Sequence, residues 1–237
     1  MPSFFLFSFF LFFVATSTAF VLPSNLDRDG KSLVVDALGF GTLAKVNSNP
    51  HPLGGSTGVE LGLSQESISS SKLGTIGEDP GASSDYFNSS YITFGKGFYN
   101  NWDVFLGFAP FGQQIQSQLY GGLLRWCFWN KPLYRFSLTF HGSGTNIQNK
   151  FFSEGSGMDL VSAVTWRNFD FYLGAGPATV SARFSPTILV STENLYSSSS
   201  TVRTFTGITY EWGKYFIATE YHRVRESTYA LKLGFRL

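Results

Sequence analysis

The side chains best suited to chemistry lie in the middle of the chain. His141, Ser143 and Glu154 are close in sequence and belong to the residue types that nucleophilic hydrolysis uses. His51 lies between two prolines, in the run 49–52, which predicts a turn. A lone histidine in such a turn does not indicate a metal ligand, so we expect neither a metal nor a cofactor.

A second set of chemically notable side chains consists of charged residues placed at alternate positions of otherwise apolar stretches. Six acids and six bases share this spacing, so their charges balance. An unpaired buried charge is costly, and the pattern therefore predicts a network of ion pairs inside the protein. Its expected members are Glu60, Asp103, Asp159, Asp170, Glu211 and Glu220 with Arg125, Arg135, Arg167, Arg203, Lys232 and Arg236.

The last eleven residues show which kind of element carries these charges. Apolar and polar residues alternate without exception along 227–237, which indicates a β-strand with one apolar and one polar face. Its apolar face consists of Tyr229, Leu231, Leu233, Phe235 and Leu237.

Nine further segments upstream show the same alternation. We expect strands at 57–64, 88–96, 101–109, 118–128, 133–141, 157–167, 169–176, 201–212, 215–222 and 227–237. Long connections at 65–87, 110–117, 142–156 and 177–200 alternate with short turns. Short turns on one side and long loops on the other are typical of a transmembrane barrel. The expected fold is an all-β, antiparallel, up-and-down barrel of about ten strands, within a range of eight to twelve.

Composition narrows the class of protein. Aromatic residues make up 18% of the chain and charged residues only 14%, whereas soluble domains carry about a quarter charged residues. A barrel with lipid outside and a filled lumen would have this balance. The net charge of +1 and the absence of a basic run give no indication of a nucleic-acid partner. A secreted β-sandwich or a lipocalin-like barrel is disfavoured by the aromatic strand ends on the apolar face.

The N-terminus reads as an export signal. An apolar run from Phe4 to Val14 precedes a small-x-small site at 17–19, which predicts a signal peptide over 1–19. Residues 20–55 show no clear strand and are expected to form a periplasmic lead-in or a plug. The barrel itself is expected over 56–237.

The alternating C-terminal strand, with an aromatic near its end, resembles the assembly signal of bacterial outer-membrane β-barrel proteins. The resemblance implies an outer-membrane location in a Gram-negative envelope, contact with lipid and lipopolysaccharide, and handling by the barrel-assembly machinery. The function that fits best is a structural or surface-interaction barrel, with external loops that could contact a partner. A porin-like narrow pore for small solutes is the first alternative.

A second, local resemblance concerns the residues named first. His141, Ser143 and Glu154 resemble the His-x-Ser motif with a later Glu of the lipid A 3-O-deacylase family, over about 30 residues from Leu138 to Arg167. In that family the His would serve as base and the Ser as nucleophile, and the Glu would orient the His. Gly144 stands where that family has Asn. A lipid A-modifying hydrolase is therefore the second alternative, while a non-enzymatic role is favoured.

Overall fold

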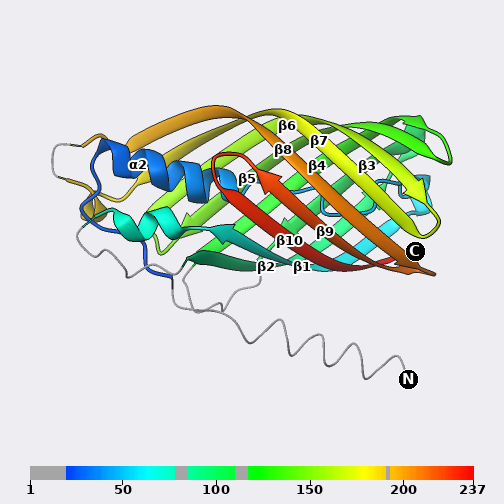
Figure 1. Ribbon diagram of the computed structural model, residues 1–237, viewed down its shortest axis with the longest axis horizontal. Coiled ribbons are helices and arrows are strands. Elements are labelled where there is room, and N and C mark those ends of the chain that lie inside the picture. The colour runs from blue at the N-terminus through cyan, green and yellow to red at the C-terminus, as the bar shows by residue number, and fades with distance from the viewer. Residues whose placement is uncertain (1–19, 78–84, 110–116, 191–192) are drawn as a thin grey trace, which may run out of the picture.

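A computed structural model describes residues 20–77, 85–109, 117–190 and 193–237 of the chain. Ten β-strands make up most of it (Figure 1). They are β1 (Val59–Ser69), β2 (Tyr86–Gly97), β3 (Trp102–Phe108), β4 (Ser117–Asn130), β5 (Tyr134–Ile147), β6 (Phe151–Trp166), β7 (Phe169–Phe184), β8 (Tyr196–Trp212), β9 (Tyr215–Arg223) and β10 (Ser227–Arg236).

The strands form one closed barrel in which each strand pairs antiparallel with its sequence neighbours, and β1 pairs with β10 to complete the ring. Closure leaves no unpaired edge, which matters for any sheet that must satisfy its own backbone groups. The seam register places Glu60 opposite Arg236 and Leu63 opposite Leu233. The expected antiparallel barrel of about ten strands is confirmed.

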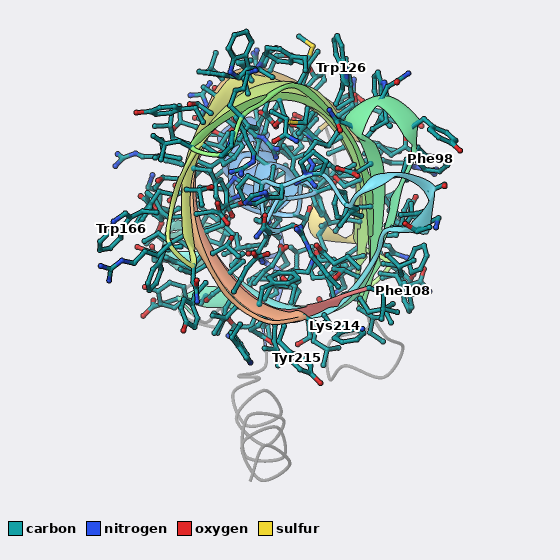
Figure 2. The ribbon with its side chains drawn as sticks, turned by 90° about the vertical axis from the view of Figure 1, so that its right-hand side faces the viewer. Phe98, Phe108, Trp126, Trp166, Lys214 and Tyr215 are labelled. Carbon is teal, nitrogen blue, oxygen red and sulfur yellow. The ribbon has the colours of Figure 1, made fainter. Side chains whose placement is uncertain are left out.

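Alternating burial along each strand sorts side chains between the outside and the lumen. Leu61 is 47% exposed, whereas its neighbour Glu60 is fully buried. Viewed from the end that carries the C-terminus, side chains such as Trp126, Trp166 and Tyr215 radiate outward from the ring (Figure 2). This end, where β2–β3, β4–β5, β6–β7 and β8–β9 are joined by two to four residues, is called the short-turn end.

The opposite end of the barrel is called the loop end. The connections there differ in length from those expected. The connections expected at 142–156 and 177–200 are shorter in the structure: β5 and β6 are joined by residues 148–150, and β7 and β8 by residues 185–195. Inward and outward side chains still alternate there, but the outward ones are now polar and the inward ones apolar. On β7, outward Phe171 and Leu173 give way to outward Thr179 and Ser181, and the inward residues become apolar. The polar outward residues had the composition of a loop, although they lie on a strand.

An apolar core fills the barrel at the loop end. Helix α2 (Arg28–Val34) begins with Asp27, whose carboxylate accepts a hydrogen bond from Gly30 N, and continues into the π-helix η1 (Val35–Gly39). These helices lie at the left of Figure 1. Their apolar residues pack against inward side chains of the wall, including Ile68, Phe87, Leu119, Ile147, Phe151, Val180 and Phe184. The loop end is therefore sealed by a core like that of a soluble protein.

Residues 42–53, called the luminal segment, connect this cap to the short-turn end. Short 3-10 helices flank the remaining connections: η2 (Gly55–Thr57) before β1, η3 (Ser71–Thr75) after it, η4 (Tyr99–Asn101) and η5 (Pro186–Ile188). Glycines let the wall approach the chain closely. A Cβ on Gly155 would lie 2.2 Å from Leu43 Cδ2, and one on Gly41 would lie 2.4 Å from Ile68 Cγ2.

Candidate functional site in the barrel lumen

Glu60 joins the two ends of the sheet to the luminal segment. Its carboxylate, on β1, accepts hydrogen bonds from Lys232 Nζ at 2.7 Å and Arg236 Nε at 2.9 Å, both on β10. Ser48 Oγ of the luminal segment donates to the same carboxylate at 2.8 Å. A nearby opposite charge offsets part of the free-energy cost of burying a charged side chain. Here one acid pairs with two bases. The seam of the barrel and its internal chain thus share one anchor.

A second anchor lies on β3 and β4. Asp103 faces Arg125 directly in the register, and Arg125 Nη2 donates to Asp103 Oδ2 at 2.8 Å. Arg125 also donates to the carbonyl oxygens of Asn49 at 2.7 Å and His51 at 2.8 Å. Asp103 Oδ1 accepts from Leu53 N at 3.0 Å. Both side chains are 1% exposed, so this pair is enclosed by the chain that it holds.

A third anchor crosses the sheet. Arg203 on β8 donates from Nε to Asp159 Oδ1 on β6 at 2.9 Å, and its Nη1 donates to Ala44 O at 2.9 Å. His141 Nε2 lies 3.4 Å from Asp159 Oδ2. The guanidinium therefore connects the wall to the start of the luminal segment.

Two further acids accept hydrogen bonds from the middle of the luminal segment. Glu220 accepts from Asn47 N and from Tyr172 Oη, both at 2.7 Å. Asp170 accepts from Asn49 Nδ2 at 3.1 Å. Polar networks of this kind are stable when every member is satisfied, because the low local dielectric strengthens each hydrogen bond.

Lys45 and Glu66 form a further ion pair in the lumen, with Nζ 2.6 Å from Oε2. A cavity of about 60 Å³ lies beside this pair, lined among others by Asn47 and Thr93. Asn47 Oδ1 and Thr93 Oγ1 are buried without a hydrogen-bond partner among the described residues. At about 30 Å³ for each water in the liquid, a cavity of that size has room for about two water molecules, which can satisfy both oxygens.

Counted together, these contacts hold the luminal segment to eight of the ten strands. Hydrogen bonds reach β1, β3, β4, β7, β8 and β9 as described. Arg236 Nη2 on β10 donates to Asn49 O at 2.9 Å, and Thr145 Oγ1 on β5 donates to Thr42 Oγ1 at 2.8 Å. Contacts on so many sides place the segment inside the ring.

The structure places eleven of the twelve expected luminal residues on the inner face. Glu211 and Arg236 lie at the rim of the short-turn end, with Arg236 Nη1 3.8 Å from Glu211 Oε1. Arg135 Nη1 lies 3.5 Å from Asp170 Oδ1. The prediction for Arg167 is wrong. It is exposed in the β6–β7 turn, with φ +57°, because β6 ends at Trp166 and the alternation stops there.

His141, Ser143 and Glu154 are not brought together. His141 and Ser143 face inward, and His141 is buried beside Asp159. Glu154, paired in register with Gly144, lies on the outward face of β6 and is exposed. The sheet wall therefore separates Glu154 from His141, the histidine that it would orient. The three residues do not form the arrangement that the hydrolase alternative requires.

Sequence reasoning missed the partners supplied by the luminal segment. Asn47, Ser48 and Asn49 contact wall acids, and His51 Nε2 lies 3.2 Å from Asp170 Oδ1. Only Glu66 left a signal, because it continues the inward alternation of β1 beyond the expected end at residue 64.

Two other features are absent from the part of the chain that the structure describes. Over the described ranges, no helix is long and apolar enough to cross a membrane. Within the same part of the chain, no group of three or more His, Cys, Asp or Glu side chains is arranged to hold a metal ion.

A closed antiparallel barrel with an apolar outer face and a charged lumen defines the fold class of the bacterial outer-membrane β-barrel proteins. The resemblance expected from the C-terminal strand therefore holds at the level of fold. No family model matches the chain, and no curated protein matches it.

Solved structures of this class are similar to the chain at low identity. A loop-deletion mutant of OmpT, an outer membrane protein of Vibrio cholerae, is 8% identical with a TM-score of 0.32; the match covers 64% of this chain and 54% of that chain, about half its length. The N-terminal β-barrel domain of Pseudomonas aeruginosa OprF is 10% identical, TM-score 0.37, covering 77% and 99%. Ail of Yersinia pestis, solved with the heparin analogue sucrose octasulfate, is 15% identical, TM-score 0.33, covering 76% and 97%.

Proposed function

We propose that the protein is an integral outer-membrane barrel whose lumen is closed by its own residues 42–53, and that it serves as a structural or surface-interaction barrel. The observation that carries this proposal is the set of hydrogen bonds between the luminal segment and eight strands of the wall.

Insertion into a bilayer is supported by the outer surface. Large apolar side chains such as Leu106, Leu160 and Leu173 are more than half exposed. Aromatic residues are exposed at the short-turn end, where Trp102 and Trp126 stack with ring centroids 5.5 Å apart. An apolar belt with an aromatic border is the arrangement that a barrel presents to lipid. The proposed surroundings are outer-membrane lipid and lipopolysaccharide.

Delivery to that membrane would use the last strand. Tyr229 on β10 and Leu237, which directly follows β10, are exposed on the outer face, and the apolar residues between them share their parity. We propose this row as the signal read by the barrel-assembly machinery, following an export signal over 1–19, which lies outside the described residues.

A closed lumen is supported by the cost of opening it. Withdrawal of the luminal segment would strip Asp103, Glu60 and Glu220 of hydrogen bonds from Leu53, Ser48 and Asn47. Breaking a buried polar network by removing one partner typically costs several kcal/mol. Several such anchors act on one short segment, so spontaneous release would be rare.

Specific contacts with a partner would then fall to the loop end. There the outward faces of β6, β7 and β8 carry exposed Ser and Thr in place of apolar residues, as at Ser156, Thr179 and Ser198. A polar outer wall beyond the apolar belt suits an aqueous surface rather than lipid.

Membrane insertion is tested by gel migration and extraction. The folded protein should migrate faster than the boiled protein, and an alkaline wash should leave it in the membrane fraction. Identical migration together with release by the wash would contradict the proposed class.

The closed lumen is tested separately by single-channel recording of protein refolded into a planar bilayer. We expect no discrete conductance steps from protein whose gel migration shows it to be folded. Reproducible steps would instead support the porin-like alternative, with the balanced charges of the lumen predicting weak ion selectivity.

A further inference from the structure

Among the side chains that the structure describes, those at the short-turn end that carry a charge without an ion-pair partner are basic. Each of its four turns has one base in or beside it: Lys96 at the end of β2, Lys131, Arg167 and Lys214. Lys131, Arg167 and Lys214 are exposed, and none of the four has a carboxylate within ion-pair distance among the described residues. These four residues are called the basic rim.

The loop end differs, because acids and bases are mixed there and several are tied together. Lys31 Nζ lies 2.7 Å from Glu193 Oε2, and Lys72 Nζ lies 2.5 Å from Glu226 Oε1. Exposed Asp27 and Glu154 add negative charge at that end. The two ends of the barrel therefore differ: among the described residues, unpaired side-chain charges of both signs lie at the loop end, whereas those at the short-turn end are basic.

Aromatic side chains accompany the basic rim. Lys131 Nζ lies 5.8 Å from the ring centroid of Trp129, and the Arg167 guanidinium lies 5.3 Å from that of Trp166. Lys214 precedes the exposed Tyr215, and Figure 2 shows both at the periphery of the ring. Aromatic rings at such positions mark the level of lipid headgroups, so the bases lie where headgroup phosphates would be.

We infer that the basic rim binds the headgroups of anionic phospholipids in the leaflet at the short-turn end. This inference rests on the proposed membrane insertion. The four bases are spread over separate turns around the circumference and do not converge on one pocket, so a single free phosphate would meet one base at a time. A shell of anionic lipids, with acyl chains on the apolar belt and phosphates at the turns, meets all four.

The chain contains its own probe for this shell. Its five tryptophans are Trp102, Trp126, Trp129, Trp166 and Trp212, and all lie at the short-turn ends of β3, β4, β6 and β8. Tryptophan fluorescence of the full chain, refolded into mixed vesicles, is quenched by brominated lipid that touches this end. Comparing brominated phosphatidylglycerol with brominated phosphatidylcholine gives the relative affinity of the shell for the anionic lipid.

We expect phosphatidylglycerol to be enriched about twofold or more, since each base near an anionic lipid surface adds favourable electrostatic energy. The triple variant Lys131→Gln, Arg167→Asn, Lys214→Gln should bring the ratio to about one; asparagine suits the positive φ of residue 167. The matched control is Arg28→Gln, Lys150→Gln, Arg183→Gln, which removes three loop-end bases and should leave the ratio unchanged.

Each result is decisive. A ratio of one in the native chain, or an unchanged ratio in the rim variant, would overturn the inference while leaving membrane insertion intact. Loss of the enrichment when inorganic phosphate replaces chloride at equal ionic strength would show phosphate binding rather than lipid binding, and would also overturn it. Failure of the native chain to show heat-modifiable migration in either vesicle would instead contradict the proposed function itself.

Discussion

Arg203 on β8 reaches Asp159 on β6 across the intervening strand β7, donating from Nε to Oδ1 at 2.9 Å. The span is open because Gly176 of β7 stands opposite Arg203 in the register. A Cβ at that glycine would lie 1.7 Å from Met158 O. One ion pair therefore joins two strands that are not neighbours in the sheet, and its guanidinium also donates to Ala44 O of the luminal segment.

Breaking this pair on one side should destabilise the barrel. Asp159→Ala leaves Arg203 buried without its carboxylate, which typically costs about 3 to 5 kcal/mol in the free energy of unfolding. The double variant Asp159→Ala, Arg203→Met should recover much of that loss. Urea unfolding followed by tryptophan fluorescence measures both. Glu154→Gln, on the outward face of the same strand, is the control; a loss no larger for Asp159→Ala than for this control would contradict the role of the pair.

A small side chain at Gly41 should disturb the cap. Its Cβ would lie 2.4 Å from Ile68 Cγ2, and overpacking of this kind typically costs about 1 to 3 kcal/mol. Gly107→Ala is the matched control, because its Cβ would lie 3.7 Å from the nearest atom, an ordinary contact. Thermal unfolding monitored by circular dichroism should separate the two variants. Equal midpoints would show that the cap accommodates the added methyl group without a loss of stability.

A disulfide can test the path of the luminal segment directly. Thr145 Oγ1 donates to Thr42 Oγ1 at 2.8 Å, so Thr42→Cys with Thr145→Cys, in a Cys127→Ser chain, should cross-link on mild oxidation. Thr42→Cys with Thr139→Cys is the control, since six residues of β-strand separate the two wall positions by about 20 Å. Thiol counting by mass spectrometry reports the bond. Cross-linking of the control pair would place the segment elsewhere.

Acidity should act on the cap through Asp36 of η1. Burial raises the pKa of this carboxyl above its usual value of 3.8, and Arg225, 3.9 Å away, opposes that rise only in part. A raised folded-state pKa gives stability that is complete below the unfolded pKa and is lost as the pH rises through the folded pKa. Asp36→Asn should therefore raise the unfolding temperature at pH 7, and the gain should disappear below about pH 3.8. A variant less stable than the native chain at pH 7 would contradict this sign.

The sequence was enough to predict the barrel because alternation and short turns are local properties. In β10 every second residue is apolar, and such a strand can bury only one face. The same rule misplaced the loop-end strands. Ser181 and Val180 still alternate there, but the polar residue faces outward and the apolar one inward. The hydropathy pattern, interpreted on the assumption that every strand has an apolar outer face, assigns these polar outward residues to a loop.

The luminal network was only half predictable. Inward parity identified Glu60 and Lys232, since both lie on strands with clear alternation. Their third partner, Ser48, belongs to an irregular segment whose position depends on contacts with distant strands. The prediction that Arg167 faces the lumen failed for a different reason. The residues before it do alternate, but a two-residue turn ends β6 one residue before Arg167.

The luminal segment follows the cap at the loop end, runs through the barrel and leaves it at the short-turn end, where β1 starts. Glu60 pairs across the β1–β10 seam with Lys232 and Arg236 and also holds Ser48. One carboxylate therefore serves two purposes, because it joins the first strand to the last and also fixes the chain inside the ring. Closure of the ring and seating of residues 42–53 are thereby energetically coupled, so a change that weakens one weakens the other.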